Sequence, residues 1–157
     1  MKDWLRFAVA ILVPQAAGGI GALFTAPEIG RWYASLTWPA YTPPDWAFGP
    51  VWTVLFLLMG IAAFLVWRKG LTDGRVQVAL AAFIIQLVLN TLLSFLFFGM
   101  HSPALALIEI VLLWIAIAAT IFFFYRISRP AAYLLAPYTL WVTFAAYLNY
   151  QFWILNY

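Results

Sequence analysis

Five long apolar stretches, separated by short polar segments, constrain this chain more than any other feature of its sequence. A helix needs about 20 mostly apolar residues to cross the hydrocarbon core of a bilayer, and each stretch reaches that length. We therefore predict an all-α integral membrane protein, a five transmembrane helix bundle that forms a single domain over residues 1–157. The predicted helices span about 4–24, 46–67, 76–98, 104–125 and 131–155, with a long outer loop at 25–45.

The composition agrees with a lipid environment. The chain is 67% hydrophobic and 8% charged, whereas soluble domains are about 45–50% apolar and about 25% charged. It has no cysteine and a single histidine, which excludes disulfides, thiolate metal sites and multi-histidine metal sites. We therefore expect no metal site and no obligatory cofactor.

The basic residues follow the membrane topology, so the net charge of +3 does not indicate a nucleic-acid partner. With five spans, the N-terminus shares one side with the second and fourth loops, and seven of the eight basic residues fall there. The positive-inside rule then predicts a multi-pass protein with a cytoplasmic N-terminus and an outer C-terminus. No Ala-x-Ala site ends the first apolar run, so we interpret it as a retained helix. The seven residues are Lys2, Arg6, Arg68, Lys69, Arg75, Arg126 and Arg129.

Polar and aromatic residues from several spans converge on the outer half of the predicted bundle. Gln86, Asn90 and Ser94 recur every four residues and therefore share one helix face. We predict a pocket with aromatic walls and a few polar groups, as ligand sites usually have, with residues 39–44 as its lid. The other contributors are Gly18, Gly19 and Gly21, then Trp46 and Trp52, and then Trp141, Ala145, Leu148 and Asn149.

Structural interpretations of the same residues remain open. The polar face of the third helix can serve only as hydrogen-bonding glue between helices. Trp46 and Trp52 are also typical of an interfacial aromatic belt. The glycines favour close helix packing, and Ala17 and Gly21 have the spacing that permits it within or between chains.

Two ionisable residues stand apart from this layer. Glu109 is the one carboxyl group within a span, where a charge costs about 2.5–3.5 kcal/mol on insertion scales. It is either a hydrogen-bonded structural residue or a proton or ligand contact. His101 lies in the turn before the fourth helix, and we interpret it as a polar turn residue, with haem ligation as the alternative.

Four motifs at matching positions resemble those of the tryptophan-rich sensory protein and translocator protein family (TspO/MBR), which is also the peripheral-type benzodiazepine receptor family. Residues 32–46 read WYxxLxxPxxxPPxW, and Pro50-Val51-Trp52-Thr53 follow. Residues 86–94 read QLxxNxxxS, and residues 137–149 read PYxxWxxxAxxLN. The likeness covers nearly the whole chain, which we identify as a bacterial member in the cell membrane.

The resemblance implies a homodimer that binds porphyrins, haem-type tetrapyrroles or benzodiazepine-site ligands under the first loop. Ala40 and Tyr41 stand where the family often has tryptophan, and no basic residue follows Tyr150 to complete the mammalian cholesterol motif. By the matching motifs, the predicted ligand-binding residues are Tyr33, Pro43, Pro44, Trp46, Trp52, Asn90, Ser94, Trp141, Ala145 and Leu148.

These features predict a tetrapyrrole-binding receptor or sensor, with two alternatives. The first is light-dependent porphyrin breakdown, for which Trp52 and Trp141 are the only candidate catalytic residues by resemblance. No hydrolytic triad or metal cluster supports other enzyme chemistry. The second is a proton-linked transporter that uses Glu109, although the absence of internal repeats argues against it.

Overall fold

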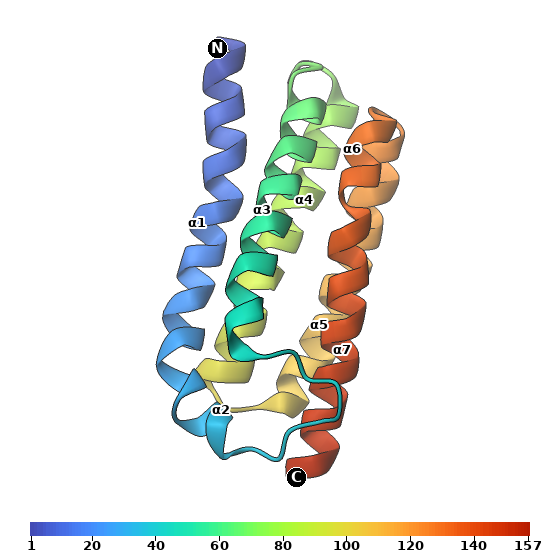
Figure 1. Ribbon diagram of the computed structural model, residues 1–157. Coiled ribbons are helices and arrows are strands. Elements are labelled where there is room, and N and C mark those ends of the chain that lie inside the picture. The colour runs from blue at the N-terminus through green and yellow to red at the C-terminus, as the bar shows by residue number, and fades with distance from the viewer.

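A computed structural model describes residues 1–157 as a bundle of long helices without strands (Figure 1). Five helical spans are long and apolar enough to cross a membrane, which confirms the predicted fold class. A short helix, α2 (Trp32–Ser35), lies in the first loop. The spans are α1 (Asp3–Ile29), α3 (Asp45–Trp67), α4 (Gly74–Ser94) with the π-helical turn η1 (Phe95–Gly99), α5 (Pro103–Tyr125), and α6 (Arg129–Leu134) with α7 (Ala136–Asn156).

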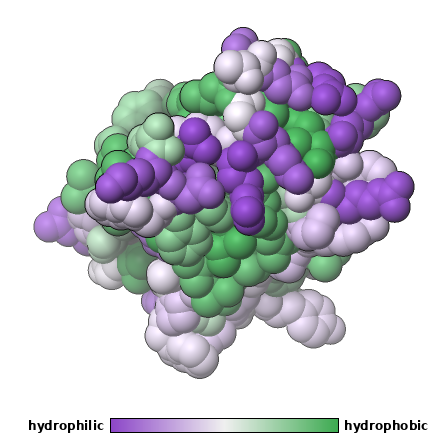
Figure 2. Space-filling view, turned by 90° about the horizontal axis from the view of Figure 1, so that it is seen from above, coloured by the Kyte–Doolittle hydropathy of each residue, from purple (hydrophilic) through white to green (hydrophobic).

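The two ends of the bundle differ in charge. The N-terminus and the α3–α4 and α5–α6 turns lie at one end, which we call the N-terminal end (Figure 1). Helix α2, the first loop and the C-terminus lie at the other, the C-terminal end. Seven of the eight basic residues therefore gather at the N-terminal end, where Figure 2 shows hydrophilic side chains beside exposed apolar ones.

Helix α1 is longer than predicted, because it ends at Ile29 and not near residue 24. The sequence prediction treated Thr25 and Pro27 as parts of the outer loop. In the structure the Thr25 hydroxyl donates to the Gly21 carbonyl oxygen one turn back, at 3.2 Å. Membrane helices tolerate proline, and Pro27 lies in the last turn of this one. The first loop is correspondingly shorter than predicted.

The last span contains a break that the prediction of one helix at 131–155 missed. Helix α6 ends at Leu134 and α7 begins at Ala136. Pro137 has no backbone N–H to donate to the Tyr133 carbonyl, and its ring disfavours α-helical geometry at the residue before it. The Leu135 backbone N–H instead donates to the Ala132 carbonyl oxygen in a tighter turn, at 3.1 Å.

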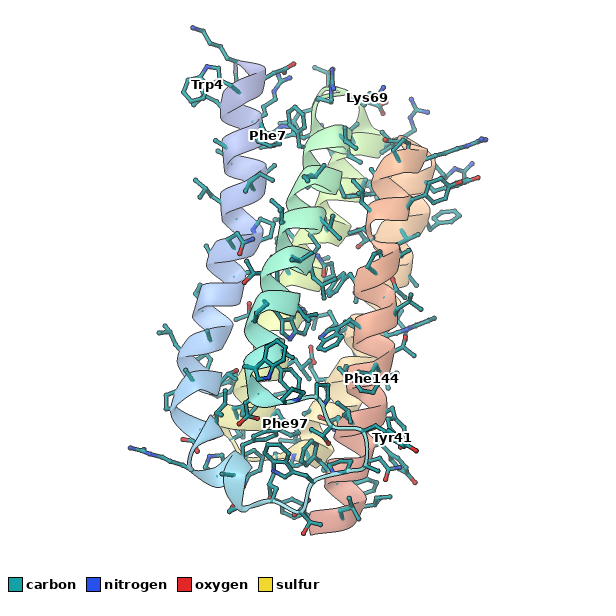
Figure 3. The ribbon with its side chains drawn as sticks, viewed as in Figure 1. Trp4, Phe7, Tyr41, Lys69, Phe97 and Phe144 are labelled. Carbon is teal, nitrogen blue, oxygen red and sulfur yellow. The ribbon has the colours of Figure 1, made fainter.

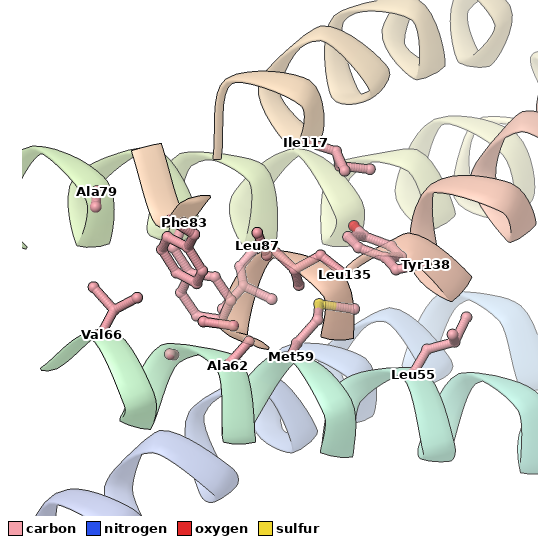
Figure 4. Packing of buried hydrophobic residues seen from close by; sticks show 14 of the residues in the cluster. Leu55, Met59, Ala62, Val66, Ala79, Phe83, Leu87, Ile117, Leu135 and Tyr138 are labelled. Atoms are coloured by element: carbon pink, nitrogen blue, oxygen red, sulfur yellow. The ribbon is translucent and has the colours of Figure 1, made fainter. Parts of the chain in front are cut away.

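The largest hydrophobic cluster fills the space between α3, α4, α5 and α6 (Figure 4). Met59, Ala62 and Val66 from α3 are completely buried in it. They meet Val76 and Ala79 from α4, which are buried to the same degree. This core lies towards the N-terminal end and leaves the C-terminal half of the bundle free to form a cavity.

Helix α1 packs against α3 through glycines that bring the two backbones close. A Cβ atom on Gly60 would lie 2.6 Å from the Ala10 carbonyl oxygen and 2.9 Å from Ile11 Cα. A Cβ atom on Gly18 would lie 2.4 Å from the ring of Phe56. The Gly60 contact is with backbone, which cannot move aside as a flexible side chain does.

We predict that Gly60→Ala destabilises the protein by about 1–3 kcal/mol, the usual cost of overpacking a tight contact. The matched control is Gly19→Ala on α1, because a Cβ atom there meets nothing within 4 Å. Alanine stabilises a helix interior by about 0.5–1 kcal/mol relative to glycine, so the control should hold or gain stability. Thermal unfolding in detergent, followed by tryptophan fluorescence, measures both. Equal unfolding temperatures for Gly60→Ala and the parent chain would contradict the close α1–α3 contact.

Candidate functional site

A cavity of about 660 Å³ lies in the C-terminal half of the bundle, between α1, α3, α4 with η1, and α7. Ligand pockets usually measure about 300–1,000 Å³, so the cavity has room for a ligand of that class. Gly18, Gly19 and Gly21 line its α1 side. Eight of the ten predicted binding residues also line it: Tyr33, Trp46, Trp52, Asn90, Ser94, Trp141, Ala145 and Leu148.

Two indole side chains face the cavity from α3 and α7. The Trp52 ring stacks on Phe56, with 5.5 Å between ring centroids and 29° between planes. The Trp141 ring meets the edge of Phe48, at 6.0 Å and 70°. These neighbours restrict both indoles, so the cavity presents pre-arranged aromatic surfaces to a flat ligand.

An aromatic cluster closes the cavity at the C-terminal end. Tyr33 from α2 is 4% exposed and packs against Phe97, Phe98 and Phe152. Figure 3 shows Phe97 in this crowded layer of side chains. Burial raises the pKa of the Tyr33 phenol above its ordinary value, and the nearby Asp45 carboxylate adds to the rise. The phenol therefore stays protonated at neutral pH and can donate a hydrogen bond.

The loop from residue 36 to residue 44 contributes no lining residue, so the structure does not place Pro43 and Pro44 at the cavity. The reason is local: Pro44 is the extended residue that precedes the first turn of α3, and the two prolines lead the chain into that helix. The loop closes the end of the bundle indirectly. The Trp38 indole N–H donates to the Tyr33 carbonyl oxygen at 3.0 Å and so anchors α2.

Asn156, near the end of α7, holds the same loop by two hydrogen bonds. Its Oδ1 accepts from the Thr37 backbone N–H at 2.7 Å. Its Nδ2 donates to the Thr37 carbonyl oxygen at 3.1 Å. One amide thus satisfies both backbone groups of a single loop residue, as a neighbouring strand would.

A buried hydrogen-bond chain joins α4 to α7 beside the cavity. Asn90 Nδ2 donates to the Tyr138 hydroxyl at 2.9 Å, and that hydroxyl donates to Gln86 Oε1 at 2.7 Å. Gln86 therefore acts as packing glue, whereas Asn90 both joins this chain and lines the cavity. Asn90 Oδ1 and the Ser94 hydroxyl make no hydrogen bond within the protein, and both residues line the cavity.

Tyr138 was not among the predicted residues, although its place within a membrane span could have indicated a hydrogen-bonding role. A tyrosine inside a membrane span needs a partner for its hydroxyl group. The repeated polar face of the third predicted helix offered such partners. The sequence alone does not give the rotation of α7 against α4, so the pairing emerges only from the structure.

The cavity opens sideways, between the halves of α1 and α3 that lie towards the C-terminal end. Gly19, Ala22 and Ala26 on α1 line it and are exposed. Three residues of α3 also line it and are exposed: Trp46, Gly49 and Thr53. Trp46 is 76% exposed. Gln15 Nε2 donates to the Thr53 carbonyl oxygen at 3.0 Å, at the edge of this opening nearer the N-terminal end. An apolar ligand can thus enter from the surrounding lipid.

Glu109 does not line the cavity, although its neighbour Ile110 does. Successive residues on a helix point about 100° apart, because 3.6 residues complete a turn. Glu109 is 4% exposed, and neither of its carboxyl oxygens has a hydrogen-bond partner within the protein. The predicted structural hydrogen bond to a neighbouring helix is therefore absent.

His101 makes more contacts than a simple turn residue. Its Nε2 lies 3.0 Å from Glu28 Oε2 at the end of α1. The Trp32 indole stacks on the imidazole at 4.5 Å and 12°, and the Tyr157 hydroxyl donates to the His101 carbonyl oxygen at 3.3 Å. His101 thus joins α1, α2 and the last residue of the chain at the C-terminal end.

Comparison with known proteins identifies the family to which this architecture belongs. The model of the TspO/MBR family matches residues 10–154. The chain belongs to this family. It is similar to the tryptophan-rich protein TspO of Archaeoglobus fulgidus, with 43% identity over 118 residues that cover 74% of this chain and 75% of the relative. The human translocator protein is 38% identical over 119 residues, which cover 74% of this chain and 70% of that one.

A third relative, the tryptophan-rich sensory protein of Cereibacter sphaeroides, is 38% identical over 118 residues. The match covers 75% of this chain and 70% of the relative. Family membership and the five apolar helices together identify a multi-pass membrane protein.

We predict that Tyr138→Phe destabilises the protein by about 1–3 kcal/mol, because it leaves the buried Asn90 and Gln86 amides without their shared partner. Tyr133→Phe is the matched control, since Tyr133 is 64% exposed and its hydroxyl makes no hydrogen bond within the protein. Thermal unfolding in detergent compares the two variants. If both unfold at the same temperature, the hydrogen-bond chain does not stabilise the α4–α7 contact.

Proposed function

We propose that this TspO/MBR protein is a membrane receptor or sensor whose cavity binds porphyrins or haem-type tetrapyrroles. One observation carries the proposal. A cavity of about 660 Å³ presents Trp52 and Trp141 together with a small number of polar groups. The name of the Cereibacter sphaeroides relative, a tryptophan-rich sensory protein, agrees with a sensory role. Benzodiazepine-site ligands belong to the same class of flat, largely apolar molecules.

The chemistry of the lining suits a flat macrocycle. Offset stacking on indole favours extended π-systems, and Trp52 and Trp141 supply two such surfaces. Asn90 Oδ1 and the Ser94 hydroxyl are free to bond polar substituents, and the Tyr33 phenol can donate to a propionate. Each of these contacts fixes orientation, while the apolar walls supply most of the buried area.

A ligand in the cavity has a direct connection to the outer surface. Tyr33 lines the cavity, and its carbonyl oxygen accepts the hydrogen bond that anchors Trp38. A ligand that binds two positions of α2 with different affinity shifts the balance between them. The loop from residue 36 to residue 44 would then report occupancy to a partner outside the membrane.

The orientation follows from the basic residues gathered at the N-terminal end. We infer that this end faces the bacterial cytoplasm, as the positive-inside rule requires. The C-terminus, the first loop and the cavity then lie towards the outer side of the cell membrane. We also infer a homodimer, as the family resemblance implies.

We predict saturable binding of protoporphyrin IX to the purified protein in detergent. Trp141→Ala and Asn90→Ala should each weaken it at least about tenfold, which corresponds to about 1.4 kcal/mol. Tryptophan quenching and the porphyrin absorption band measure the affinity. Trp4→Ala is the control, because Trp4 is 65% exposed and lies at the opposite end of the bundle (Figure 3). Binding that is absent, or equal in all variants, would overturn the proposed ligand or its site.

Light-dependent porphyrin breakdown is a second candidate, favoured by the presence of both Trp52 and Trp141 at one cavity. An indole beside an excited porphyrin can give it an electron, which the reduced porphyrin passes to dioxygen as superoxide. The indole radical then regains an electron from the macrocycle, so that the porphyrin is oxidised and dioxygen is the net oxidant. We predict that the double variant Trp52→Phe, Trp141→Phe loses illumination-dependent bleaching while it retains porphyrin binding. Bleaching at the parent rate in this variant would remove the enzymatic candidate.

Proton-linked transport receives less support. Glu109 is the one carboxyl group away from the end turns of a span, and it does not line the cavity. A solute in the cavity would therefore not contact the group that would couple its movement to protons.

A further inference from the structure

A second cavity, of about 250 Å³, lies between α1, α3 and α4 towards the N-terminal end. It shares no residue with the first, so it is separate from the proposed tetrapyrrole site. All of its lining residues are hydrophobic: Val9, Ala10, Val13, Ala63, Trp67, Leu71, Leu80, Phe83 and Ile84. Val9 and Val13 are each 40% exposed, and Leu71 and Ile84 are each 48% exposed. The cavity is therefore a groove that opens towards lipid.

The position of the groove suits one acyl chain of a phospholipid. Along α1, the distance from Arg6 to Val13 is about 10 Å at 1.5 Å per residue. The hydrocarbon of one leaflet is about 15 Å thick, half of the bilayer core. A chain whose head group lies level with Arg6 thus has its upper part in the groove.

Basic side chains border the groove at its polar end. Arg6 precedes Val9 and Ala10 by three and four residues, so it lies on the same face of α1, one turn nearer the end. Arg68 and Lys69 lie between the lining residues Trp67 and Leu71. Both are exposed, and neither pairs with a carboxylate within the protein.

The Arg6 guanidinium also has a buried donor without an acceptor. Its Nη1 lies 3.2 Å from Asp3 Oδ1, whereas its Nε is buried and has no hydrogen-bond partner within the protein. Buried donors normally find a partner, because leaving one unpaired is costly. The Arg6 side chain is 25% exposed, so a lipid phosphate can reach only that exposed part of the side chain and not the buried Nε.

Aromatic contacts fix the basic rim. The Phe7 ring meets the edge of Phe64 across the α1–α3 contact, at 5.2 Å and 85°. The Arg68 guanidinium lies over the Phe64 ring, 5.7 Å from its centroid. Figure 3 shows Phe7 directed from α1 towards the neighbouring helices and Lys69 at the same end of the bundle.

We propose that this groove binds an anionic phospholipid, with one acyl chain between α1, α3 and α4 and the phosphate among Arg6, Arg68 and Lys69. Apolar walls alone would accept any lipid. The charges of the basic residues select a head group with net negative charge, because a cationic choline would meet like charges.

Native mass spectrometry of the full chain, released from detergent with equal amounts of phosphatidylglycerol and phosphatidylcholine, tests the proposal. We expect one phosphatidylglycerol to be retained preferentially. The double variant Arg6→Gln, Arg68→Gln should weaken its retention about tenfold. The control Arg126→Gln, Arg129→Gln removes the same charge at the same end but does not border the groove, and it should retain the lipid. Equal retention of both lipids, or equal loss in both double variants, would overturn the site.

A second pair of variants tests the groove itself. Val13→Phe fills the groove, whereas Leu12→Phe adds the same bulk at a neighbouring residue that is 65% exposed and does not line it. Only Val13→Phe should release phosphatidylglycerol, with protoporphyrin IX binding and the unfolding temperature in lipid-free detergent preserved as controls on the fold. Undiminished lipid retention in Val13→Phe would show that the acyl chain does not lie in the groove.

Discussion

The backbone contact between α1 and α3 is the constraint on which the rest of the structure depends. Gly60 permits it, because a Cβ atom there would meet the Ala10 carbonyl oxygen at 2.6 Å. Gly18 accepts the Phe56 ring further along the same pair of helices. The groove on the N-terminal side uses Ala10, and the larger cavity on the C-terminal side uses Gly18 and Phe56. One helix–helix contact thus separates two sites.

Each polar group buried in the bilayer core needs a hydrogen-bond partner from the protein, since water is absent there. The Tyr138 hydroxyl is that partner for both Gln86 and Asn90. The arrangement joins α4 to α7 and leaves Oδ1 of Asn90, a residue that lines the cavity, without a hydrogen-bond partner within the protein. A network that stabilises the bundle therefore also supplies a contact group to the proposed ligand site.

Hydrophobic length and residue spacing predicted the five spans and the layer in which the tryptophans and Asn90 meet. They did so because each span is long and each face repeats regularly. Contacts between segments distant in sequence were not predictable: Asn156 with Thr37, and His101 with Glu28. The family motifs likewise named Pro43 and Pro44, yet their side chains serve the entry into α3. A motif records which residues recur, and it does not record which way they point.

The sideways opening between α1 and α3 has a consequence for measured affinities. An apolar ligand that enters between Gly19 and Trp46 is in equilibrium with ligand molecules dissolved in the bilayer. Its occupancy then depends on its mole fraction among the lipids and only indirectly on its aqueous concentration. The same protein will show different apparent dissociation constants at different ratios of lipid or detergent to protein, although no contact in the cavity has changed.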